Sequence, residues 1–126
     1  MLATVAIKAT RLAAWLLLAA ITFFTLGPAQ DRPQTSFSHD LEHALAFIPL
    51  GIAFGCGYAT RRTAIAIVGV PVIGVIEILQ LWAPGRHARL EDFIINLLAF
   101  WIALAISILV EYVFNQTNRS VTSSKN

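Results

Sequence analysis

Four apolar segments follow one another along this chain and constrain its fold more than any other feature. They cover residues 11–27, 43–60, 63–82 and 93–114, and most of the charged side chains lie in the links between them. A helix needs roughly 20 apolar residues to cross a bilayer, because each residue advances the helix by about 1.5 Å. We therefore expect four membrane-spanning helices that pack as a bundle.

The composition supports this expectation. Only 13% of the 126 residues are charged and 57% are apolar, whereas about 25% of the residues in a soluble domain are charged. So small a domain exposes much of its surface, and so few charges do not cover it. The composition therefore argues against a soluble globule and against a nucleic-acid-binding module. We predict an all-α integral membrane four-helix bundle formed by residues 1–114, with a polar disordered tail at residues 115–126.

The positive charges predict how the bundle is oriented. If the N-terminus is inside, six of the nine Lys and Arg residues lie at inner helix ends, and three lie in the outer links. The inner set is Lys8, Arg11, Arg61, Arg62, Arg119 and Lys125, and the outer set is Arg32, Arg86 and Arg89. Because cytoplasmic loops carry an excess of Lys and Arg, both termini are predicted to be cytoplasmic. Arg61 and Arg62 then act as topology anchors, and Glu111 acts as an interfacial anchor.

The first segment has a second interpretation. Lys8 and Arg11 precede an apolar run that ends near the small residues Gly27 and Ala29, and this pattern is also typical of a cleaved secretory signal. Both interpretations place the next link outside, so the rest of the topology is unaffected.

Polar side chains gather at the predicted outer ends of the helices. Glu77 lies five positions before Trp82, which places it roughly 7 Å inside the end of its helix. A carboxylate at that depth is costly in lipid, so it should face the bundle or a wet cavity. Gln80 shares the face of Glu77 at spacing i+3, and Asp92 and Asn96 share a face at spacing i+4. We therefore expect one outer pocket that receives polar pairs from several helices.

These side chains have candidate roles in catalysis or binding. His43, Glu77 and Asp92 are the candidate catalytic residues, since a histidine and carboxylates can exchange protons when burial tunes them. The candidate binding residues are Gln80, Arg86, Arg89 and Asn96. Two structural alternatives stay open: Glu77 is a buried charge that Arg86 or Arg89 neutralises to fix the helix register, and Asp92 is only a helix N-cap.

No metal site or other cofactor is expected. His39 and His43 stand at the i, i+4 spacing that suits zinc, but no third histidine follows at a fixed spacing. Cys56 is the only cysteine, which excludes an intrachain disulfide and a thiolate cage.

Two stripes of small residues indicate where helices can approach closely. Gly51 and Gly55 form a G-x-x-x-G on the second segment, while Ala99, Ala103 and Ser107 repeat at the same spacing on the fourth. Such stripes bring helix backbones together in lipid. Chance in segments rich in Ala and Gly is the alternative.

The polar pattern resembles that of a known family. A Glu-x-x-Gln pair, a short arginine-bearing loop and an Asp-x-x-x-Asn pair at the start of the last helix are together similar to the VanZ-like family of small four-helix bacterial membrane proteins. The matching residues are Glu77 and Gln80, then Arg86, then Asp92 and Asn96, preceded on the second helix by His43 and Phe47. Within residues 39–104 the chain departs from the usual pattern at His39, Asp40 and Ala99.

The resemblance implies an envelope-related role at the outer side of a bacterial cytoplasmic (inner) membrane that the chain crosses several times. The family takes its name from a protein associated with resistance to the glycopeptide teicoplanin, and its general mechanism is not established. Two functions stay open: an accessory or binding protein, or an intramembrane enzyme acting on a lipid or lipid-linked substrate by acid–base chemistry. The expected partners are the bilayer, a lipid-linked envelope component or membrane partner protein, and a further copy of the chain; no nucleic acid is expected.

Overall fold

The computed structural model describes residues 2–27, 36, 38–82 and 89–123, and within these ranges it contains helices and no strands. Two short 3-10 turns lie at helix ends: η2 (Ala59–Arg61) connects α2 to α3, and η3 (Gln80–Trp82) follows α3. The four α-helices are α1 (Leu2–Leu26), α2 (His39–Gly57), α3 (Arg62–Leu79) and α4 (Leu90–Ser123). The prediction of an all-α, four-helix chain is therefore confirmed.

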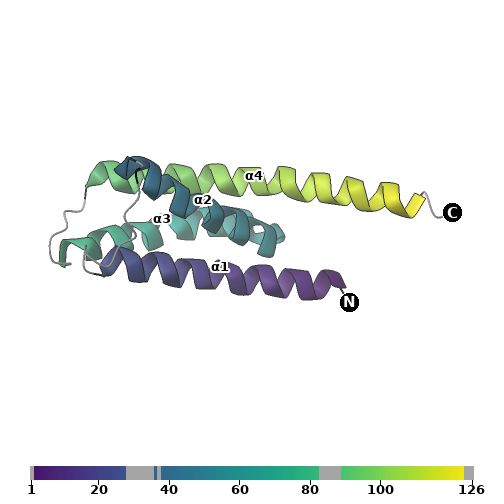
Figure 1. The fold of residues 1–126 in the computed structure, drawn as a ribbon, viewed down its shortest axis with the longest axis horizontal. Helices are drawn as coiled ribbons and strands as arrows, with labels where there is room; N and C mark the ends of the chain where they lie inside the picture. The colour runs from purple at the N-terminus through teal and green to yellow at the C-terminus, as the bar shows by residue number, and fades with distance from the viewer. Residues whose placement is uncertain (1, 28–35, 37, 83–88, 124–126) are drawn as a thin grey trace.

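The helices run up and down, so that their ends gather in two groups (Figure 1). Both termini lie toward one end of the bundle with the turn between α2 and α3, while the starts of α2 and α4 lie at the other end with η3. Helix α2 packs most extensively on α4 and next on α1, and α3 packs mainly on α4. Contacts of α3 with α1 and α2 are few, although α2 and α3 are neighbours in sequence.

The close packing of α2 on α4 rests on the two stripes of small residues. A Cβ added to Gly51 would lie 2.6 Å from both Ala103 Cβ and Phe100 O, and one added to Gly55 would overlap the side chain of Ser107. Ala103 and Ser107 are fully buried. The two stripes therefore face each other, and the absence of side chains on α2 lets the two backbones meet.

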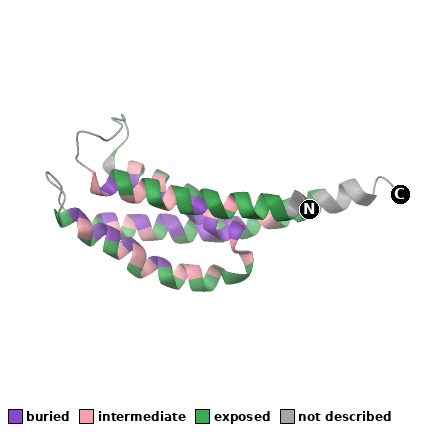
Figure 2. Ribbon diagram, turned by 90° about the horizontal axis from the view of Figure 1, so that it is seen from below, coloured by how far each residue is buried: buried purple, intermediate pink, exposed green. Residues whose placement is uncertain are grey.

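The apolar surface fits a bilayer. The core holds Phe47, Leu50, Ile73 and Phe100. Exposed residues follow the outward faces of the helices (Figure 2), and many of them are large and apolar. Within the described part of the chain, three spans are long and apolar enough to cross a membrane: Thr4–Leu26, Ala59–Trp82 and Leu90–Thr117. Helix α2 has a shorter apolar stretch, Leu41–Gly57. A soluble protein rarely exposes apolar surface so extensively, which identifies the chain as a membrane protein.

The helix ends differ from those expected. Helix α1 begins at Leu2 and α2 at His39, both earlier than predicted, and α4 extends beyond 114 to Ser123. The predicted tail starts at residue 115, whereas helix α4 ends at Ser123. Residues 90–123 contain no Gly or Pro that would stop a helix. Polar side chains alone do not end a helix, so α4 continues beyond its apolar segment. The last three residues of the tail lie outside the described ranges.

Candidate functional site

Five polar side chains are buried at the end of the bundle where α2 and α4 begin. Each is at most 7% exposed, and together they come from α2, from the end of α3 with η3, and from the first turns of α4. They are His43, Glu77, Gln80, Asp92 and Asn96. We call this set the polar site.

Local helix starts place two members of the polar site. Ser38 caps α2, because its hydroxyl accepts from the amide of Leu41 at 3.4 Å, so the helix begins early enough to include His43 in its second turn. Sequence reasoning missed this cap, although serine before a helix is a known signal. Helix α4 begins at Leu90, so Asp92 is its third residue and not its N-cap. At that position the carboxylate faces the positive end of the helix dipole.

A hydrogen-bonded chain links α2, α4 and α3. Asn96 Nδ2 donates to Glu77 Oε2 at 3.4 Å, and Asn96 Oδ1 lies 3.1 Å from His43 Nδ1. Because the Asn96 carbonyl can only accept, His43 must carry its proton on Nδ1 to complete the chain. The imidazole and the carboxylate that were predicted to meet in one place are therefore joined through a single amide.

Gln80 brings an unused donor to the polar site. The side chain is 3% exposed, and its Nε2 has no hydrogen-bond partner among the residues that the structure describes. A buried donor without a partner is unfavourable, so such a group is either a defect or an arrangement for a ligand.

A cleft of about 370 Å³ opens beside the polar site between α3 and α4. Glu77 and Arg89 contribute the charged groups to its wall, and Gly74, Ile78, Leu90 and Phe93 make the rest apolar. Arg89 forms its ion pair with Glu91 at 2.7 Å, and both of these side chains are exposed. An exposed pair of this kind contributes about 0–1 kcal/mol, so Arg89 can exchange Glu91 for another anion. Arg86 and Arg89 were the two arginines considered as partners of Glu77. Arg89 lines the cleft together with Glu77, but it forms its ion pair with Glu91.

The comparisons agree with this architecture. The family model described as VanZ/LLP1 matches residues 11–111. The chain belongs to the VanZ-like family. A search of curated proteins and a search of solved structures each return no match. The matched range includes all five residues of the polar site. It also includes α1 from Arg11 onward, which the resemblance drawn from the motifs did not cover.

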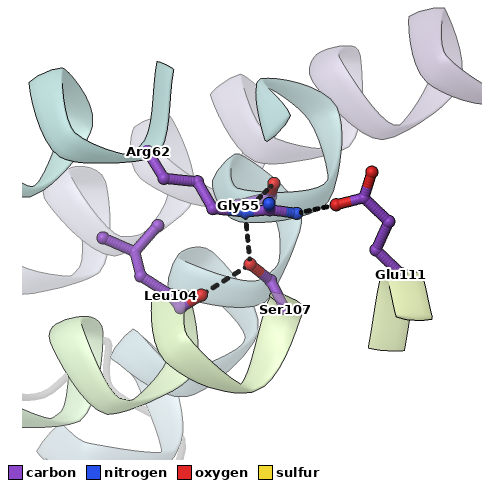
Figure 3. A network of polar contacts seen from close by, with 5 residues as sticks. All are labelled: Gly55, Arg62, Leu104, Ser107 and Glu111. Carbon is purple, nitrogen blue, oxygen red and sulfur yellow. Dashed lines mark hydrogen bonds and ion pairs between the residues drawn. The ribbon is translucent and has the colours of Figure 1, made fainter. Parts of the chain in front are cut away.

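The VanZ-like match also includes a second polar cluster, at the other end of the bundle (Figure 3). Arg62 Nη2 pairs with Glu111 Oε2 at 2.6 Å, and Arg62 Nε donates to Gly55 O at 3.0 Å and to Ser107 Oγ at 3.1 Å. Ser107 in turn donates to Leu104 O at 2.6 Å. The two charges were predicted to be separate anchors, and the structure instead joins them across α2, α3 and α4.

Other predicted site residues lie outside what can be placed. Arg86 falls outside the described residues of this VanZ-like chain, and the side chain of His39 is not described. Within the described ranges, no group of three or more His, Cys, Asp or Glu side chains is arranged to hold a metal ion.

Proposed function

We propose that this VanZ-like protein binds a lipid-linked component of the cell envelope at its polar site. The observation that carries the proposal is the convergence of buried polar side chains from three helices beside a cleft with a largely apolar wall. Buried ionisable groups in a membrane bundle are expensive, and they mark ligand or ion sites more often than they occur by chance. We propose a binding or accessory role without catalysis.

The proposed topology puts this site on the outer face of a bacterial cytoplasmic membrane. The apolar stretch of α2, Leu41–Gly57, is at the lower limit of length for a membrane span. We propose that α2 crosses the membrane as well, which makes four crossings in all. An even number of crossings then agrees with termini that lie at one end of the bundle. The excess of Lys and Arg near that end favours a cytoplasmic location for both termini.

The cleft suggests an amphipathic ligand. Arg89 offers a planar fork for a phosphate, and Glu77 offers a carboxylate for a hydroxyl or amine. Gln80 Nε2 is a buried donor of the polar site and is not part of the cleft lining. Ile78 and Leu90 are more than half exposed at the rim, so an attached lipid chain can lie against α3 and α4 without leaving the hydrocarbon.

The binding proposal is tested by the lipids that remain with the protein during purification in mild detergent. Wild-type protein should retain a lipid-linked species identifiable by mass spectrometry, and Glu77→Gln should retain at least about tenfold less, as for loss of one charge-assisted hydrogen bond. Glu91→Gln is the comparison at the same end, because Glu91 is 72% exposed and pairs with Arg89. Removing this competitor for Arg89 should leave retention at the wild-type level or raise it. Equal retention by wild type and Glu77→Gln would refute the proposal.

A second variant separates loss of binding from loss of folding. Among the described residues, a Cβ at Gly74 meets only Phe93, at an ordinary 3.5 Å. Gly74→Leu should therefore fold and fill the cleft. It is expected to reach wild-type levels in the membrane and to lose the retained species. If a membrane protein co-purifies in place of a lipid, the site serves assembly and the lipid proposal is wrong.

The His43–Asn96–Glu77 chain favours acid–base catalysis on the same ligand as the second candidate function. An enzyme would convert the retained species, and His43→Gln would block conversion while the lipid stays bound. Comparing membrane lipids from cells with excess wild type and excess His43→Gln decides between the two. A product present only with wild type supports catalysis, and identical lipid profiles support binding alone.

A further inference from the structure

A second cleft, of about 330 Å³, lies between α1, α2 and α3 and contains none of the polar-site residues. Its lining is apolar over most of its length, with Leu18, Leu50, Val68 and Ile73 among its walls. It exists because α1 and α3 contact each other at few positions. The outward faces of these two helices are covered by exposed apolar side chains, so the cleft opens toward lipid.

One wall of this cleft is a rigid set of aromatic rings. Trp15 Nε1 donates to Tyr58 Oη at 3.0 Å, and the Trp15 ring packs edge-on against Phe54 at 5.4 Å between centroids. Phe54 and Tyr58 stack at 6.0 Å. Arg11 packs on the Tyr58 ring, with its guanidinium 4.7 Å from the ring centroid, and its Nε donates to Gly57 O at 2.8 Å. The wall is therefore formed before any ligand arrives.

Among the residues that the structure describes, Arg61 is the one cation that lines the cleft, near the turn between α2 and α3. Arg61 is exposed, and its guanidinium makes no hydrogen bond or ion pair with the described part of the chain. Its neighbours differ, because Arg62 is bonded to Glu111 and Arg11 to Gly57. Among these three arginines, only Arg61 makes no guanidinium hydrogen bond to the described residues, so all of its donors can bind an outside anion.

We propose that this cleft holds one acyl chain of an anionic bilayer phospholipid whose phosphate binds Arg61. An apolar cavity open to hydrocarbon is filled by a lipid chain and not by water. The chain exchanges one apolar surrounding for another, so the cleft supplies shape but little selectivity. Selectivity comes from Arg61, which adds charge-assisted hydrogen bonds to phosphate and attraction to a net negative headgroup.

Trp15 provides the probe for this proposal, because it lies in the wall of the cleft. A variant with Trp82→Phe and Trp101→Phe leaves Trp15 as the only tryptophan of the three. It is reconstituted in vesicles that contain a small, equal fraction of brominated phosphatidylglycerol or brominated phosphatidylcholine. We expect the anionic lipid to quench Trp15 about fivefold more effectively.

Two further variants make the result specific. Arg61→Gln should bring the two lipids to equal quenching, whereas Lys8→Gln, which removes a positive charge at the same end but outside the cleft, should preserve most of the preference. Ala64→Phe, which fills the cleft, should lower quenching by both lipids. Equal quenching by the two lipids in the starting variant would overturn the proposal. Protection of Trp15 from both lipids in a dimeric protein would overturn it as well, because a second copy would then occupy the cleft.

Discussion

The two polar clusters of this bundle use similar side chains but differ in how completely their hydrogen bonds are satisfied. Around Arg62, the bonds are short, between 2.6 and 3.1 Å, and the guanidinium binds a carbonyl, a hydroxyl and a carboxylate. In the polar site, the two bonds of Asn96 measure 3.1 and 3.4 Å, and Gln80 Nε2 has no partner among the described residues. A closed network fixes helix packing, whereas an open one beside a cleft is suited to a ligand.

The largest expected effect is on packing at the Arg62 cluster. Gly55→Leu would push a side chain into Ser107 and Leu104, where α2 and α4 meet most closely. Overpacking of this kind should lower the free energy of unfolding by about 3 kcal/mol. Thermal unfolding in detergent, followed by circular dichroism, measures the loss. Gly74→Ala at the other end is the control, and a comparable loss there would break the contrast between the two ends.

A smaller effect should follow when the Arg62 network loses its charge. Arg62→Gln removes the ion pair with Glu111 and weakens the bonds to Gly55 and Ser107. Because the Glu111 side chain is 43% exposed, the pair is partly screened, and we expect a loss of about 2 kcal/mol in unfolding free energy. Arg61→Gln is the matched variant one residue away and should leave stability unchanged. Equal stability of the two variants would mean that the network does not hold the helices.

The difference between the clusters also explains what the sequence could predict. Glu77 with Gln80, and Asp92 with Asn96, were predictable because helical spacing places each pair on one face. A shared outer pocket for His43, Glu77 and Asp92 was expected, but the contact of His43 with Asn96 was not predicted. The pairing of Arg62 with Glu111 was not predictable, because it depends on how far α4 is shifted along α2 and α3. That shift is set by Gly51 and Gly55 against Ala103 and Ser107, and one sequence shows both stripes without showing that they meet.

The positions of the helix ends were the other feature that the sequence did not predict. An apolar run shows where a helix crosses lipid, but it does not show how far the helix continues into water. Helix α4 continues to Ser123 because nothing in its sequence breaks it, and Ser38 starts α2 earlier than the apolar pattern indicated. The early start matters for the polar site, because it places His43 inside regular helix, where its direction is fixed.

The smallest expected effect is a change in stability whose direction decides between two interpretations of Gln80. Gln80→Met keeps the length and nearly the shape of the side chain while removing the buried donor that has no partner in the described residues. If the donor is held for a ligand, ligand-free protein should gain stability, by about 1 kcal/mol, and should lose retained lipid. Unfolding in detergent with and without the co-purified species measures both. A loss of stability in ligand-free protein would show that Gln80 is already satisfied within the fold, and the polar site would then be a closed structural network like the one around Arg62.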